Sequence, residues 1–240
     1  MLSEQGAQQL WRTAPHACAY LPEQTARLAF IPPSTPLDGQ RYGLLLEQGF
    51  RRSGPFVYRP ACPGCSACRS LRIPAAQFQP RRRHRRCLRD NAELYVEPRS
   101  PQMTQEHFAL YRDYLHRRHP GSSMGNPGWR ESQGFLAADW CPTVFYELRT
   151  APGGRLLAVT VADILPRALS AVYTFFDPDE QARGLGTLAI LWLLREARRT
   201  GRPHVYLGYW IAEAQGMAYK AQYRPHERYC GPGAGWERVD

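Results

Sequence analysis

Short stretches that are apolar throughout, or that alternate apolar and polar residues, recur along the chain and predict β-strands. They lie at residues 70–73, 94–97, 143–149, 155–164, 169–177 and 204–208. Residues 50–60 are typical of a hairpin that turns at Ser53-Gly54-Pro55, and residues after 222 form a last extended segment.

Helical periodicity separates these strands. The clearest case is residues 185–199, where apolar side chains recur at Leu185, Leu188, Ala189, Trp192 and Leu193. A helix that Thr104 caps runs to about residue 119, and shorter helices are predicted at 42–48, 81–93 and 212–222. Residues 120–142, rich in Gly, Pro and Ser, are predicted to be a long loop.

This order of elements predicts an α+β fold, with a mixed sheet and flanking helices. We place a smaller N-terminal α+β domain at residues 1–99 and a second domain at residues 100–240. The chain of 240 residues is long enough for one large or two small buried cores.

Positive charge is concentrated in one segment. Residues 51–90 contain eleven arginines and a single acid, Asp90, which matches the net charge of +10 of the whole chain. Phosphates attract such a block through bidentate hydrogen bonds and counterion release. The alternative is a solvated arginine-rich helix. Lys220 is the only lysine, and a position that is lysine among arginines suits a titratable amine.

Composition restricts the class of protein. Hydrophobic residues make up 43% and charged residues 22%, as in an ordinary globular protein. The first twenty residues lack the apolar stretch of a signal peptide, and the longest apolar run, residues 185–194, is too short to span a bilayer. We therefore expect a cytoplasmic protein that binds neither membranes nor DNA.

A glycine-rich loop joins the last strand of the 143–177 group to the long helix. Its sequence, QARGLG at 181–186, places glycines where a helix begins, so that free backbone amides and Arg183 point at an anion. The loop resembles motif A of the Gcn5-related N-acetyltransferase (GNAT) superfamily, in which it holds a pyrophosphate. A tight glycine turn without a ligand is the other interpretation.

Cysteines form a second motif, CPGCSAC at 62–68. Three thiolates at this spacing surround one metal centre, and Cys18 and Cys87 are the candidates for a fourth ligand. We assign Cys18, Cys62, Cys65 and Cys68 to a candidate site for zinc or an iron–sulfur cluster, between which the sequence does not choose. Reduced thiols that close a tight loop are the alternative.

Together these segments resemble the bacterial N-end-rule aminoacyl-tRNA–protein transferases, which are related to the eukaryotic arginyltransferases. The resemblance covers residues 18–225 and rests on CAYL at 18–21, GFRRSGPFVYRPACPGCSACRSLRIP at 49–74, residues 78–91, SAVYTFFDPDEQARGLGTLAIL at 170–191 and GYWIAEAQGMAYKAQYRP at 208–225. It implies a GNAT-like second domain and transfer of leucine from its tRNA to proteins with N-terminal Asp or Glu, which marks them for degradation.

The chemistry is aminolysis of an activated ester and requires no cofactor. An N-terminal amine has a pKa of about 7.7–8.0, so that part of it is already neutral at pH 7. Positioning is then the main task, and it contributes about 7–11 kcal/mol at best. Candidate polar groups near the reacting atoms are Asp163, Tyr173, Tyr219 and Lys220.

Binding roles fall to two further groups of residues. For aminoacyl-tRNA we predict Gln181, Arg183, Gly184 and Gly186 at the terminal phosphates, and Arg81, Arg82, Arg83, Arg85, Arg86 and Arg89 along the backbone. For the carboxylate of the acceptor's N-terminal residue we predict Arg51, Arg52 and Arg59, with Lys220 as a further candidate.

Three other functions fit parts of the sequence. An arginyl-tRNA–protein transferase would use the same chemistry but need an acidic donor pocket. A coenzyme A-dependent acetyltransferase would not need eleven arginines. A non-catalytic, zinc-ribbon-like RNA-binding module would explain the cysteines and the basic block but not the GNAT-like pattern.

Overall fold

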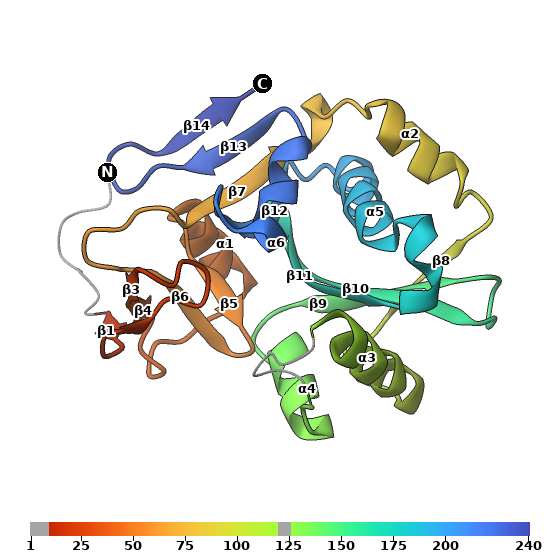
Figure 1. The fold of residues 1–240 in the computed structure, drawn as a ribbon, viewed down its shortest axis with the longest axis horizontal. Helices are drawn as coiled ribbons and strands as arrows, with labels where there is room; N and C mark the ends of the chain where they lie inside the picture. Colours follow the sequence, from red (N-terminus) through yellow and green to blue (C-terminus); the bar gives the residue numbers. More distant parts are fainter. Residues whose placement is uncertain (1–9, 120–125) are drawn as a thin grey trace.

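An eight-stranded mixed sheet forms the centre of the protein, in a computed structural model that describes residues 10–119 and 126–240 (Figure 1). Its strands follow the order β14-β13-β7-β12-β11-β10-β9-β8. Their bounds are β7 Arg69–Pro74, β8 Tyr95–Arg99, β9 Thr143–Arg149, β10 Leu156–Leu165, β11 Ala168–Phe176, β12 His204–Trp210, β13 His226–Tyr229 and β14 Trp236–Val239. Neighbouring strands are antiparallel, except that β11 and β12 run parallel.

Helices cover both faces of this sheet (Figure 1). On one face α5 (Leu185–Arg199) packs on β11 and β12, with α2 (Arg82–Arg89) against it. On the other face lie α3 (Gln105–Arg118) and α4 (Trp129–Leu136). Strand β10 is buried along nearly its whole length because both faces are covered, which explains its continuous apolar sequence.

The N-terminal part builds a smaller sheet in the order β1-β4-β6-β5. Its strands are β1 Trp11–Arg12, β4 Leu28–Phe30, β5 Arg51–Ser53 and β6 Phe56–Pro60, with a separate pair β2 His16–Ala17 and β3 Thr25–Ala26. The helix α1 (Gly39–Glu47), which Asp38 caps by accepting from the Arg41 amide at 2.7 Å, packs against β10. The predicted hairpin turn is confirmed, with Gly54 at a φ of 56°.

The predicted boundary at residue 99 passes through the main sheet. Strands β7 and β8 precede this boundary in sequence, yet β7 pairs with β12 and β13, and β8 pairs with β9. The two halves of the chain therefore share one sheet, and the division into two domains stays a prediction.

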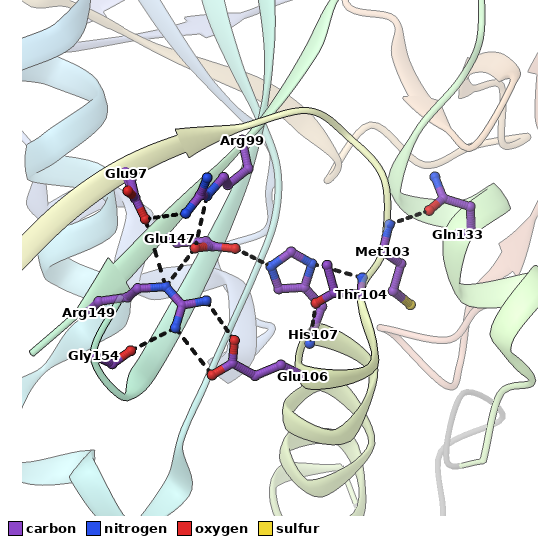
Figure 2. Close-up of polar contacts among 10 residues, drawn as sticks. All are labelled: Glu97, Arg99, Met103, Thr104, Glu106, His107, Gln133, Glu147, Arg149 and Gly154. Atoms are coloured by element: carbon purple, nitrogen blue, oxygen red, sulfur yellow. Dashed lines mark hydrogen bonds and ion pairs between the residues drawn. The ribbon is translucent and has the colours of Figure 1, made fainter. Parts of the chain in front are cut away.

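Polar contacts attach α3 to the strand edge. Thr104 caps the helix by accepting from the His107 amide at 3.1 Å. His107 Nε2 lies 2.6 Å from Glu147 Oε1, and Arg149 donates to both Glu147 and Glu106 (Figure 2). Arg149 and His107 lower the pKa of the buried Glu147 carboxyl, although burial alone would raise it. These contacts link the start of α3 to β9, while the helix itself packs on β10 and β11.

Two predicted elements were wrong. Residues 120–142 were predicted as a loop, but residues 129–136 form α4; residues 120–125 lie outside the described part. The predicted helix at 212–222 is divided into a single turn, α6 (Gln215–Ala218), and a 3₁₀ turn, η3 (Tyr219–Gln222). Gly216 weakens helix formation there, and the tighter turn carries Lys220 inward to a backbone acceptor.

Candidate active site

The two parallel strands β11 and β12 separate part-way along their length. They pair only from Ala168 to Ser170 and from His204 to Tyr206. Beyond that point β12 bulges at Gly208, which has a φ of 69°. A small cavity lies where the strands separate, and Ser170, Val172 and Gly208 are among its lining residues. Separated strands leave backbone polar groups free for a ligand, so this opening is the natural place for a reaction site.

Lys220 lies at this opening. Its Nζ donates to the carbonyl of Tyr209 at 2.5 Å and contacts Met217 Sδ at 3.2 Å, and only 6% of the residue is exposed. Burial, helped by the nearby Arg51 guanidinium, lowers the pKa of the Lys220 amine to about 7. An amine with this pKa accepts and returns a proton near neutral pH.

The three arginines proposed for the acceptor carboxylate do not converge. Arg51 and Arg52 are neighbours on β5, so their side chains lie on opposite faces of the small sheet. Arg51 faces β12, with its guanidinium carbon 5.8 Å from the Tyr209 ring centroid. Arg59 instead lies over the Phe50 ring at 4.8 Å and lines a cleft beside the cysteine loop.

Arg52 and Asp163, which we predicted in separate roles, are partners of each other. The guanidinium donates to both Asp163 oxygens, at 2.7 and 2.6 Å, and Thr143 donates to the same carboxylate at 2.8 Å. Arg52 is 2% exposed and Asp163 is completely buried. This arrangement favours a structural role, in which the pair joins the small sheet to β10.

The two candidate tyrosines differ in access. Tyr173 on β11 is half-buried among aromatic rings, with those of Tyr111, Tyr114 and Phe135 within 6.3 Å, and burial raises its pKa above the usual range. Tyr219 is 47% exposed and lies next to Lys220. Tyr219 is therefore better placed to contact a substrate at the opening.

The glycine loop begins α5 as predicted. Gly184 has a φ of 66°, and its carbonyl accepts from the amides of Thr187 and Leu188. The first backbone amides of α5 have no acceptor within the helix, so they are free to donate to a bound anion. The side chains of the glycine loop add less free positive charge at this position than we predicted. Arg183 is paired with Glu93 at 2.6 Å and with Glu180 at 2.7 Å, and Gln181 accepts from Arg118 at 3.3 Å.

Helix α2 carries its arginines outward. All six predicted tRNA-contact arginines are exposed, and among the described residues only Arg89 has a carboxylate partner, Asp90. The buried side of α2 and the segment just after it contact the glycine loop and the residue that follows η3. Asn91 Nδ2 donates to the Arg183 carbonyl at 2.9 Å, and the His84 ring stacks on Tyr223, just after η3, at 5.2 Å. A polyanion on α2 would thus lie beside the site.

The cysteines are neighbours without forming a metal-ligand arrangement. Cys62, Cys65 and Cys68 line one cleft, but within residues 10–119 and 126–240 no three His, Cys, Asp or Glu side chains converge on a point as ligands do. Cys62 Sγ accepts from the Arg27 amide at 3.4 Å, and burial raises the pKa of Cys68 to about 11. These thiols do not fit a metal as arranged, and the zinc or iron–sulfur site stays a prediction.

Comparison with known proteins identifies the family. The model of the arginine-tRNA-protein transferase C terminus matches residues 106–230, and that of the N terminus matches residues 16–86. The chain belongs to the arginine-tRNA-protein transferase family. The two matches divide near the predicted boundary at residue 99, and the predicted transferase class is confirmed.

Members of this family with similar sequences carry a more specific name. The aspartate/glutamate leucyltransferase of Halorhodospira halophila is 65% identical over 224 residues, which are 93% of this chain and 95% of the relative. That of Pseudomonas aeruginosa is 47% identical and covers 95% and 96% of the two chains. The crystal structure of FemX shares the fold, with a TM-score of 0.52, 10% identity and coverage of 88% and 84%. The GNAT-like fold is confirmed.

As a family member, the chain acts on aminoacyl-tRNA and protein. In the part of the chain that the structure describes, no helix combines the length and the apolar character that crossing a membrane requires. Two residues at the opening, Gly208 and Tyr209, were not among the predicted site residues. The predicted strand ended at Gly208, whereas β12 continues to Trp210, so that the glycine lies inside the strand, where it indicates a bulge or a close backbone approach.

Proposed function

We propose that the chain transfers leucine from leucyl-tRNA to the N-terminal Asp or Glu of proteins. The names of its relatives in Halorhodospira halophila and Pseudomonas aeruginosa support this choice of donor and acceptor. The observation that carries the mechanism is the buried Lys220 amine, with a pKa of about 7, at the opening between β11 and β12.

Leucyl-tRNA would bind across α2 and α5. Exposed arginines of α2 would contact phosphates of the acceptor stem, and the first amides of α5 would hold the phosphate next to the terminal nucleotide. The ester carbonyl then reaches the opening from the side of α5. The exposed Tyr219 hydroxyl is a candidate donor to the oxyanion of the tetrahedral intermediate.

The acceptor amine would attack this carbonyl carbon. A nitrogen–carbon bond forms, the ester carbon–oxygen bond breaks, and the proton lost by nitrogen ends on the 3′ oxygen of the tRNA. Neutral Lys220 is placed to take this proton and to pass it to the leaving oxygen. Proteins that gain leucine would then enter N-end-rule degradation, in the cytoplasm, where charged tRNA is made.

Transfer of radiolabelled leucine and arginine, each charged on its tRNA, to peptides that begin with Asp, Glu or Ala tests the proposal. We expect incorporation of leucine into the Asp and Glu peptides alone. Incorporation of arginine alone would show that the donor is arginyl-tRNA and not leucyl-tRNA, in agreement with the name of the family. Turnover of acetyl-coenzyme A with no transfer from either tRNA would refute the proposal.

A further inference from the structure

Arg51 is a recessed cation that the protein leaves without an anionic partner. Among residues 10–119 and 126–240, no carboxylate pairs with its guanidinium and no acceptor receives a hydrogen bond from it; its recorded contact is the Tyr209 ring. Arg52, the next residue on the same strand, has a bidentate carboxylate and three further acceptors. One strand therefore presents a satisfied arginine on one face and an unsatisfied one on the other.

The surroundings of Arg51 are aromatic and positively charged. After burial, the largest effects on the pKa of Arg51 come from the tyrosines at positions 20, 42, 58 and 209. The nearby Lys220 adds a second cation when protonated. In these surroundings of low polarity little solvent screens the Arg51 guanidinium, and no counterion in the described part of the chain neutralises it. Its attraction for an incoming anion is therefore stronger than at an exposed position.

The Arg51 side chain borders a small cavity. It is half-buried and is among the residues that line the cavity at which β11 and β12 separate. A Cβ at position 208 would lie 3.4 Å from Arg51 Nη1, so Gly208 leaves room beside the guanidinium. Tyr20, one of the tyrosines that act on Arg51, is 46% exposed.

We propose that Arg51 binds the side-chain carboxylate of the acceptor's N-terminal Asp or Glu and so sets the specificity for acidic residues. The inference rests on the proposed function and names the residue that recognises its acceptor. A carboxylate on the Arg51 fork places the attached α-amine beside Lys220, at the end of the opening that leucyl-tRNA does not occupy.

Arg51→Met tests this role, with peptides that begin with Asp, Glu, Asn or Gln. We expect kcat/KM for the Asp and Glu peptides to fall at least about 100-fold, to the level of the Asn and Gln peptides, because the carboxylate loses the guanidinium that binds it. The KM for leucyl-tRNA should stay unchanged. Arg112→Met is the matched control, since Arg112 also lies over an aromatic ring, at 5.7 Å from Phe108, far from the opening on α3.

Other outcomes are equally decisive. A raised KM for leucyl-tRNA, with the preference for Asp over Asn retained, would show that Arg51 binds the tRNA and would overturn the inference. Wild-type protein without any leucine transfer would instead refute the proposed function. If Arg51→Met no longer binds leucyl-tRNA, Arg51→Lys decides: a point charge without the fork should reduce the preference for Asp over Asn about 10-fold, and an unchanged preference overturns the inference.

Discussion

At the scale of single residues, three charged side chains have different roles although they lie close together in the fold. Arg52 is fully paired and holds two parts of the protein together. Arg51 has no carboxylate partner in the described part of the chain, and the Lys220 amine is buried; both conditions cost stability. Because such costly groups are common at functional sites, these two residues support the proposed reaction site.

The activity should follow the titration of Lys220. As pH rises through about 7, the amine becomes neutral and able to accept a proton, so kcat at saturating substrates should rise with a step near that pH. Lys220→Met should lower kcat on the order of 100-fold and remove this step. The measurement is kcat against pH for both proteins. A variant that keeps the step would assign it to another group.

The free energy of unfolding should also depend on the protonation of the Lys220 amine. Its pKa is about 7 in the folded protein against 10.5 ordinarily, so that between these values the unfolded state binds more protons and wild-type stability rises with pH. Below pH 7 both states are protonated and the burial cost is present in full. Lys220→Met should therefore be more stable than wild type by on the order of 3–5 kcal/mol at pH 6, and this gain should shrink towards pH 10.5. Urea unfolding across this range measures it.

Asp163→Ala should destabilise the fold by about 3–5 kcal/mol, because it leaves the buried Arg52 guanidinium unpaired. Urea unfolding at pH 7 gives the change. The double variant Arg52→Met/Asp163→Leu should recover most of the loss, since no charge stays buried. A single variant with unchanged stability but abolished transfer would instead return Asp163 to the catalytic residues.

At the scale of elements, α2 and the residues after it connect the predicted tRNA surface to the glycine loop and to the segment after η3. Its outer side presents arginines, while Asn91, just beyond its end, donates to the glycine loop, and His84 stacks on Tyr223 after η3. A bound tRNA would thus press on the two segments that surround the reacting ester. In the proposed function the helix would both bind tRNA and support the candidate site.

Salt dependence of tRNA binding tests this surface. Replacing Arg81, Arg82 and Arg86 with Gln should reduce the slope of log K against log salt by about 2, since each lost phosphate contact removes about 0.7–0.9. The maximal rate at saturating leucyl-tRNA should change little. The matched control is Arg112, Arg130 and Arg167→Gln, which removes the same charge from other exposed positions. Equal slopes for the two triple variants would place the tRNA elsewhere.

At the scale of the whole molecule, one sheet joins segments that are distant in sequence. Strand β7 lies between β12 and β13, so residues 69–74 complete a sheet whose other strands come mostly after residue 142. The opening between β11 and β12 faces β5 of the small sheet, which supplies Arg51. The site is therefore formed by both halves of the chain.

A fragment of residues 100–240 should accordingly fail to fold alone. It lacks β7 and β8, and the neighbouring strands would lose their hydrogen-bond partners and expose apolar surface. Near-UV circular dichroism and thermal unfolding of the fragment and the full chain provide the comparison. A cooperative transition in the fragment would support the division at residue 99 as two independent domains.

The sequence by itself determined the elements with strong local signals and the class of chemistry. Period 3.6 fixed α5, the Thr104 cap fixed the start of α3, and Ser-Gly-Pro fixed the hairpin turn, because each signal acts within a few residues. Eleven arginines in forty residues indicated a polyanion partner. Helix α4 and the divided segment at 212–222 were missed, since packing decided them.

Only the tertiary structure decided which candidate residues meet. Arg51 and Arg52 are adjacent in sequence, yet strand geometry sends one to the opening and the other to Asp163, 111 residues away. The pKa of Lys220 depends on its burial and on Arg51, which come from distant segments. Partners and burial belong to the folded state, and no pattern within a short stretch of sequence specifies them.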